Sequence, residues 1–132
     1  MLTIELINNN IPRLQLQDSV GKALQLINDF RVTHLPVVAD SKYLGMVSEE
    51  DLLDVEEEKM PIELMQEAFT NPSVFENEHF LNAVNCSNQF DTTVVPVISQ
   101  AKDFLGVITT SDLLKALGNF AGTNEIGGII IL

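Results

Sequence analysis

The chain has 132 residues, of which 45% are hydrophobic and 20% are charged, and its formal net charge is −12. This composition is typical of a folded globular protein and excludes a disordered chain. Only two arginines and five lysines are present. The charge therefore disfavours nucleic acid and anionic membranes as partners, because both require clustered cations.

The sequence also indicates where the protein functions. The single cysteine, Cys86, allows no disulfide within the chain, which favours a reducing compartment. The N-terminal sequence MLTIELINNN lacks the basic and apolar regions of a secretory signal. No apolar run is long enough to span a bilayer. We expect a cytoplasmic protein.

The first predicted elements are a short extended segment at 13–16 and a helix at about 20–31. The apolar residues of the helix recur at helical spacing, and Asp18 or Ser19 precedes it as the N-cap. A β-hairpin follows, with the strands HLPVV and YLGMVS. A second helix begins near Glu49.

The same order of elements returns about sixty residues later. It comprises an extended segment at 73–75, a helix at about 78–89, the strands VVPVI and FLGVIT, and a helix beginning near Thr110. The offset is 60 residues up to Pro96 and 61 residues from Gly106. The extra residue lies in the polar loop SQAKDF, where an insertion costs little.

The duplication predicts an α+β fold of two β-α-β-β-α repeats, at residues 1–58 and 59–118. A unit of about 60 residues buries only about 60% of the surface that its unfolded chain exposes, so it is marginal alone. Two such repeats can bury their apolar sheet faces against each other. We therefore expect the repeats to share one folded module.

The motifs LPVV…LGMVSEEDLL and VPVI…LGVITTSDLL resemble two CBS domains in tandem, an arrangement also called a Bateman module. The resemblance covers nearly all of residues 1–118. It implies a pseudo-twofold axis between the repeats and two clefts between them. It also implies a regulatory module that senses AMP, ADP, ATP or S-adenosylmethionine, and that forms a homodimer. A dimerisation module that binds no ligand is the alternative.

The resemblance also implies binding residues. In the family, the serine or threonine before the second helix contacts the phosphate or ribose side of a nucleotide, and the aspartate three residues later binds ribose hydroxyls. The candidate ligand-binding residues are Arg13, Arg31, Thr33, His34, Pro36, Ser48, Asp51, Ser73, Thr93, Pro96, Thr109 and Asp112. Ser48 and Thr109 can equally serve as N-caps with an acid at N3, and the two roles can coexist.

The two copies differ where a phosphate would need a cation. Arg31 and Arg13 occupy positions that the family places in the cleft, and their counterparts in the second copy are Asp91 and Ser73. A phosphate requires a cation or a set of free N–H donors. We therefore expect unlike clefts and at most one nucleotide per chain, carrying few phosphates.

Nothing in the sequence indicates catalysis. It contains no glycine-rich phosphate loop, metal-ligand cluster or nucleophile elbow, so neither a metal nor a cofactor is expected. The acidic run at 49–58 could share a hard cation, but a solvated charged face is the simpler interpretation. An enzyme that uses Cys86 or a histidine is the remaining alternative.

Residues 119–132 depart from the repeat. The stretch 126–132 contains no polar side chain and would be an aggregation-prone strand if left free. Its ending, GGIIIL, is similar to the opening strand of an ACT-type domain, which follows CBS pairs in some bacterial regulators. We interpret it as the start of a further C-terminal domain. A terminal strand packed in its own fold is the alternative.

Overall fold

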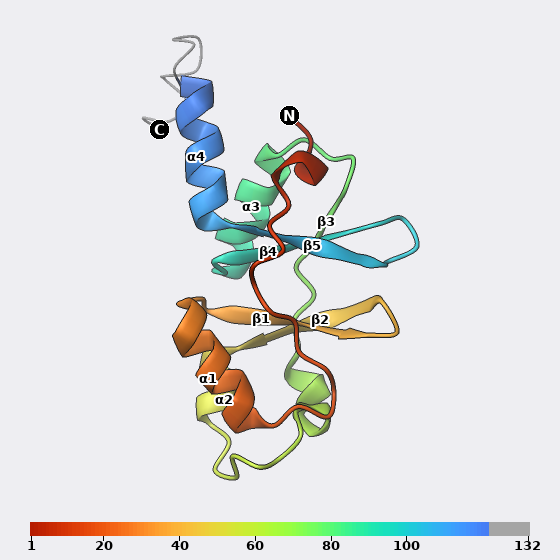
Figure 1. Cartoon of the computed structure of the whole chain (residues 1–132), viewed down its shortest axis with the longest axis vertical. Coiled ribbons are helices and arrows are strands. Elements are labelled where there is room, and N and C mark those ends of the chain that lie inside the picture. Colours follow the sequence, from red (N-terminus) through yellow and green to blue (C-terminus); the bar gives the residue numbers. More distant parts are fainter. Residues whose placement is uncertain (122–132) are drawn as a thin grey trace.

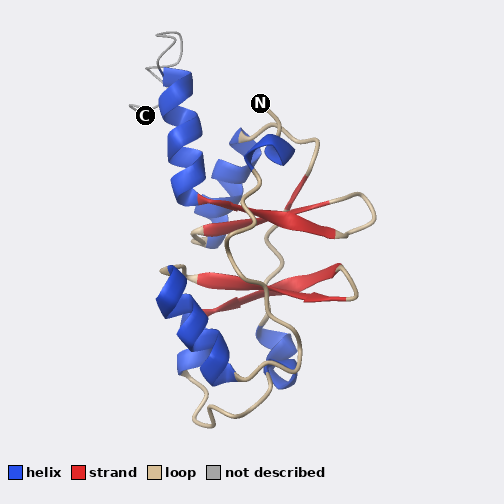
Figure 2. Ribbon diagram, viewed as in Figure 1, coloured by secondary structure: helices blue, strands red, loops and turns tan. Residues whose placement is uncertain are grey.

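The structure is a computed structural model that describes residues 1–121, with side chains described up to residue 119. Two halves are stacked on each other, each with a small sheet facing the other half and with helices on its outer side (Figures 1 and 2). The prediction of an α+β fold is confirmed.

The first half is a two-stranded antiparallel hairpin with two helices. Its elements are β1 (His34–Ala39), β2 (Lys42–Ser48), α1 (Val20–Phe30) and α2 (Glu49–Leu53). Ser19 is the N-cap of α1, because its side chain accepts a hydrogen bond from the backbone N–H of Lys22. The helix ends at Arg31, which adopts a left-handed conformation with φ of 55°.

The second half repeats this arrangement with one more strand. Its elements are β3 (Val74–Phe75), α3 (Leu81–Phe90), β4 (Val94–Ile98), β5 (Phe104–Thr109) and α4 (Thr110–Ala121). The strand order is β3-β4-β5, in which β3 is parallel to β4. In the first half, Leu14 forms the equivalent parallel bridge to Val37. The extended segments at 13–16 and 73–75 therefore lie as predicted.

The helix expected from residue 78 begins three residues later, at Leu81. The backbone N–H groups of Asn82 and Ala83 donate to the carbonyls of His79 and Phe80, three residues back. A tight turn thus precedes the regular helix, and a tight turn of this kind is common at helix N-termini.

The hairpin turns account for the change of offset. In the first hairpin, Asp40 and Ser41 form a two-residue turn with φ of 49° and 66°. Two successive positive φ values are characteristic of a type I′ turn, which matches the twist of the strands. The extra residue lies between equivalent paired positions: four residues separate Val38 from its partner Tyr43, and five separate Ile98 from its partner Phe104. Lys102, in the longer loop, adopts φ of 69°.

Each half is completed by a segment that lies outside its hairpin-and-helix unit. The short helix η1 (Thr3–Leu6) packs on the second half, where the backbone N–H of Thr3 donates to the carbonyl of Glu78 at 2.9 Å. The short helix η2 (Ile62–Ala68) packs on the first half, where Ile62 donates to the carbonyl of Asp18 at 2.9 Å. The end of η2 therefore lies beside the first hairpin, where the backbone N–H of Met46 donates to the carbonyl of Thr70 at 2.7 Å.

The pseudo-twofold axis passes between Thr33 and Thr93. The backbone N–H of each threonine donates to the hydroxyl of the other, at 3.0 and 3.1 Å. Behind this pair, Met46, Val94 and Val107 are almost fully buried between the two hairpins. The pairing of the repeats across an apolar sheet interface is therefore as predicted.

The short helix α2 is stabilised by packing against the core of the first half. With five residues it is far too short to be stable alone. Leu52 is fully buried in the core of the first half and anchors it. Full burial of a leucine contributes about 1.5–3 kcal/mol. The anchored first turn holds Asp51 in position.

The apolar tail lies almost wholly outside the described residues. The helix α4 extends through Ala121, so the start of the predicted tail is helical. The expectation of a further C-terminal domain concerns residues beyond that point.

Candidate functional site

A cleft of about 360 Å³ opens between the two halves where β1 and β2 meet the start of α2, and we call it the Asp51 cleft. It is lined by Thr33, His34, Met46, Ser48, Glu49, Glu50, Asp51, Ala68, Thr70, Phe90 and Asp91. The first repeat supplies the strand ends and the helix start. The second supplies Phe90 and Asp91 at the end of α3, so the cleft is shared by both repeats.

Ser48 and Asp51 form the start of α2 on one wall of the cleft. The Ser48 hydroxyl accepts a hydrogen bond from the backbone N–H of Asp51 at 3.0 Å, so Ser48 is an N-cap as predicted. The Asp51 carboxylate accepts no hydrogen bond from any residue within the described part of the chain. It lines the cleft with its acceptor sites available.

His34 stands beside this carboxylate. Its Nδ1 lies 2.7 Å from the hydroxyl of Thr33. Burial lowers the pKa of His34, and the carboxylates of Asp91 and Asp51 raise it by a smaller amount. The imidazole is therefore held in its neutral form at pH 7.

The cleft is acidic. Four carboxylates line it, those of Glu49, Glu50, Asp51 and Asp91, and no lysine or arginine of the described residues does. A phosphate would meet like charge without a cation to offset it. Hydroxyl groups and cations suit this lining better.

The start of α4 in the second repeat is equivalent to the start of α2, but the carboxylate of its aspartate makes different hydrogen bonds. The Asp112 carboxylate accepts from both the backbone N–H (2.9 Å) and the hydroxyl (2.7 Å) of Thr109, while the backbone N–H of Asp112 donates to that hydroxyl at 3.1 Å. This reciprocal capping confirms the predicted capping arrangement. The same carboxylate oxygen also accepts from the side-chain amide of Asn8 at 3.3 Å. Asp112 is thus engaged where Asp51 is not.

Comparison with known proteins identifies the fold. Residues 4–58 match the family model of the CBS domain. The first repeat is therefore similar to a CBS domain. A CBS domain pair/ACT domain protein from Thermotoga maritima is similar over 90% of this chain and 98% of its own, with 18% identity and a TM-score of 0.80. The chain as a whole has the fold of a CBS domain pair.

Two further structures share this fold. The CBS domains of a transcriptional regulator from Streptococcus pneumoniae match with 21% identity and a TM-score of 0.72, covering 87% of this chain and 98% of that one. CBSX2 in complex with AMP matches with 20% identity and a TM-score of 0.71, covering 91% of this chain and 98% of its own.

The CBS pair brings together only some of the predicted binding residues. The Asp51 cleft contains Thr33, His34, Ser48 and Asp51, and Thr93 adjoins it through its hydrogen bond to Thr33. Other predicted residues are placed elsewhere. Pro36 and Pro96 are buried within β1 and β4, Ser73 is half-buried ahead of β3, and Arg31 is an exposed cap of α1.

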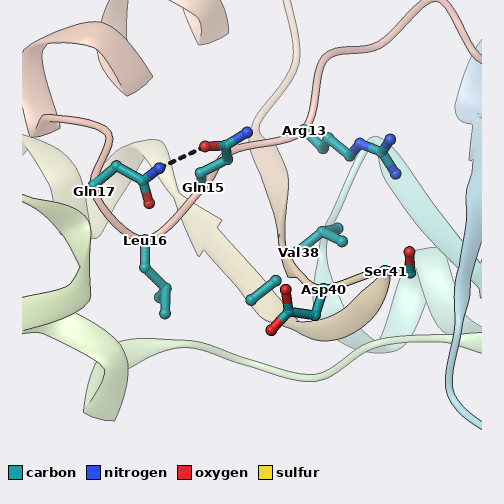
Figure 3. Close-up of a pocket in the computed structure, with 8 residues that line it drawn as sticks. Arg13, Gln15, Leu16, Gln17, Val38, Asp40 and Ser41 are labelled. Atoms are coloured by element: carbon teal, nitrogen blue, oxygen red, sulfur yellow. Dashed lines mark hydrogen bonds between the residues drawn. The ribbon is translucent and has the colours of Figure 1, made fainter.

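Arg13 lines a different surface. A hollow of about 350 Å³ lies between Arg13, Gln15 and Gln17 on one side and the β1–β2 turn at Asp40 on the other (Figure 3). The Gln17 amide donates to the Gln15 side chain at 2.6 Å. The Arg13 guanidinium carbon lies 5.7 Å from the centre of the Phe104 ring, within cation–π range. Arg13 is therefore not part of the Asp51 cleft.

The sequence does not indicate the positions of Asn8, which contacts Asp112, or of Thr70, which lines the Asp51 cleft. It also gives no sign that Asp91 of the second repeat lines the cleft that contains Asp51. The pseudo-twofold relation could have indicated this crossing, because a cleft between two repeats draws on both.

Two absences apply to the described residues. No group of three or more His, Cys, Asp or Glu side chains there is placed to hold a metal ion. Within the same residues, no helix has both the length and the apolar character that crossing a membrane requires. Cys86, the single cysteine, is buried, and burial raises the pKa of its thiol.

Proposed function

We propose that this CBS pair is a non-catalytic regulatory module that senses an adenosine-containing ligand in the Asp51 cleft. The observation that carries the proposal is the Asp51 carboxylate, which lines a cleft of about 360 Å³ and accepts no hydrogen bond from a described residue. A carboxylate is an acceptor with two oxygens and suits the two vicinal hydroxyls of a ribose. The complex of the similar protein CBSX2 with AMP supports this ligand class.

The negative charge of the cleft lets the candidate ligands be ranked by expected affinity. Unit charges 4 Å apart interact by about 1 kcal/mol in water and about 4 kcal/mol near a protein surface. Each added phosphate therefore weakens binding in a cleft lined by four carboxylates. We expect adenosine and the cationic S-adenosylmethionine to bind best, followed by AMP, ADP and ATP.

Sensing follows from the position of the cleft. Phe90 and Asp91 of the second repeat face Ser48 and Asp51 of the first. A ligand that contacts both walls favours the arrangement of repeats that fits it, and passes that preference to an attached or partner domain. A reducing cytoplasm is the proposed location, since the chain has one cysteine.

A ligand-free dimerisation module is the second candidate function. Leu53 on α2 and Leu114 on α4 are 65% and 69% exposed, and they occupy equivalent positions in the two repeats. A matched pair of exposed leucines suits a protein interface. We propose a homodimer in either case.

A thermal-shift panel of adenosine, AMP, ADP, ATP and S-adenosylmethionine distinguishes the two functions. A ligand at 100 times its dissociation constant stabilises the folded state by about 2.7 kcal/mol. We expect adenosine or S-adenosylmethionine to raise Tm, and Asp51→Ala to abolish the shift. If no ligand of the panel raises Tm, the sensing proposal is wrong and the dimerisation module stands.

A further inference from the structure

The hollow of about 350 Å³ beside the tip of the first hairpin is separate from the Asp51 cleft, and we call it the Arg13 hollow. Figure 3 shows Arg13 and Gln15 on one edge, Asp40 of the β1–β2 turn on the opposite edge, and Val38 between them. The residues that line this hollow and those that line the Asp51 cleft have no member in common.

The Arg13 hollow has charges of opposite sign on its two edges. Arg13 and Asp40 are both exposed, and neither forms an ion pair with the other or with any further residue in the described part of the chain. Gln15 accepts a hydrogen bond from Gln17 at 2.6 Å, and its NH₂ group is turned toward Arg13 (Figure 3). One edge therefore presents N–H donors and the other presents a carboxylate.

Phe104 of the second repeat holds both charged groups in place. The Arg13 guanidinium carbon lies 5.7 Å from the centre of the Phe104 ring, within cation–π range. The backbone N–H of Phe104 donates to the carbonyl of Ser41 at 2.8 Å, which fixes the turn that carries Asp40. Asp40 has the positive φ of 49° that its turn requires. The separation of the two charges is therefore set by the fold.

The second repeat lacks both charges of this hollow. The counterpart of Arg13 is Ser73, and the counterpart of Gln15 is Phe75. The turn of the second hairpin, at residues 100–102, contains no acidic side chain. The arginine and the turn aspartate are thus present together in one copy and absent together from the other. This difference favours a joint role for the two charges.

The charge pattern favours a zwitterion over a simple anion. Arg13 also borders a second hollow, of about 410 Å³, in which it is the only charged residue among those described. An anion needs Arg13 alone, but the net charge of −12 repels it. A zwitterion has no net charge, and its two charged groups match the two edges of the Arg13 hollow.

We propose that the Arg13 hollow binds a free amino acid with an apolar side chain. The α-carboxylate accepts hydrogen bonds from Arg13 and Gln15, and the α-ammonium group donates to Asp40. The side chain lies against Val38 and Leu16, in the apolar part of the lining. The volume of about 350 Å³ is within the range of small-molecule sites. Ion pairs at exposed side chains are weak, so we expect millimolar affinity.

The test follows the backbone amide signals of Asp40 and Ser41 by NMR while L-alanine, L-valine, L-leucine or L-methionine is added to the full chain. We expect at least one of these amino acids to give saturable shifts there at millimolar concentration. Its amide lacks the carboxylate and its N-acetyl form lacks the ammonium group, so each should bind about tenfold more weakly. No saturable shift from any of the four, or a derivative that binds equally well, overturns the inference.

Two variants assign the two charges. Arg13→Gln should weaken binding of the amino acid about tenfold and leave binding of its amide unchanged, because the amide has no carboxylate to lose. Asp40→Asn should do the same for the amino acid and its N-acetyl form, and asparagine tolerates the left-handed conformation of this turn. Lys59→Gln and Asp54→Asn are the matched controls, since both residues are exposed and lie outside the hollow. Equal losses in the controls would reduce the effect to net charge and overturn the inference.

The outcomes are independent of the proposed function. Asp51→Ala should leave the affinity for the amino acid unchanged, whether or not adenosine binds the Asp51 cleft. A thermal melt of each variant establishes folding. If Arg13→Gln fails to fold, the comparison of the amino acid with its two derivatives in the parent protein decides the question.

Discussion

His34 lines the Asp51 cleft together with Asp51 and Asp91, and burial lowers the pKa of its imidazole more than these two carboxylates raise it. The pKa in the folded state is therefore below the value of about 6.5 for an unfolded chain. Between those two pH values the unfolded state binds more protons. The contribution of His34 to stability is thus fully present above pH 6.5 and falls as the pH drops through the folded pKa.

We expect an NMR titration of the His34 ring to have its midpoint below pH 6.5. The free energy of unfolding of the parent protein should be lower at pH 5.5 than at pH 7.5, as measured by denaturant unfolding. In the variant His34→Gln this decrease should be smaller, because glutamine does not take up a proton. A midpoint above 6.5 would show that the carboxylates outweigh burial.

At the scale of elements, each hairpin contains a glycine where another part of the chain crosses it closely, residues 69–71 at Gly45 and residues 7–9 at Gly106. Gly45 adopts φ of 143°, and a Cβ added there would lie 2.9 Å from the backbone carbonyl oxygen of Thr70. Gly106 adopts φ of 149° and would meet the side chain of Ile7. The Thr70 backbone cannot move away from Gly45 without disturbing the Asp51 cleft, because Thr70 lines that cleft.

Gly45→Ala should destabilise the fold by about 1–3 kcal/mol, because it adds a strained φ to a clash with backbone. Gly118→Ala is the matched control, since Gly118 lies within α4 with nothing within 4 Å of an added Cβ. That change should stabilise by up to about 1 kcal/mol, from helix propensity alone. Urea unfolding midpoints measure both, and a neutral Gly45→Ala would contradict the close crossing.

The elements themselves could be predicted from sequence because each carries a local signal. The 60- and 61-residue offsets, the helix caps and the extra loop residue all reflect spacing along the chain, and each is found in the structure. The segments at 7–9 and 69–71, which cross the hairpins, could not be placed in this way. The contact between Asn8 and Asp112 joins residues 104 apart in sequence, and only the folded chain brings them together.

The same reason explains the part of the candidate site that the sequence did not place. Ser48 and Asp51 belong to one motif and lie together as expected. The sequence predicts Arg13 at a phosphate but cannot predict its neighbour in space, since its guanidinium lies over the ring of Phe104 in the other repeat. A motif fixes neighbours within one repeat, whereas the cleft depends on how two repeats are packed.

At the scale of the whole molecule, we expect the homodimer to depend on Leu53 and Leu114. Each exposes more than half of its side chain on a helix of the outer layer. The double variant Leu53→Glu/Leu114→Glu should convert a dimer to a monomer in light scattering at high micromolar concentration. Leu64→Glu is the control, because Leu64 is equally exposed, at 71%, but lies on η2. A parent protein that is monomeric would contradict the dimer.

The central claim is that Asp51, and not its counterpart Asp112, holds the ribose of an adenosine-containing ligand. Calorimetric titration of adenosine into the parent, Asp51→Ala and Asp112→Ala tests it most directly. Loss of a hydrogen bond to a charged group costs about 1.5–3 kcal/mol, so Asp51→Ala should weaken binding more than tenfold. We predict one adenosine per chain in the parent and in Asp112→Ala. Two equivalent sites in the parent, or binding that survives Asp51→Ala unchanged, would contradict the account.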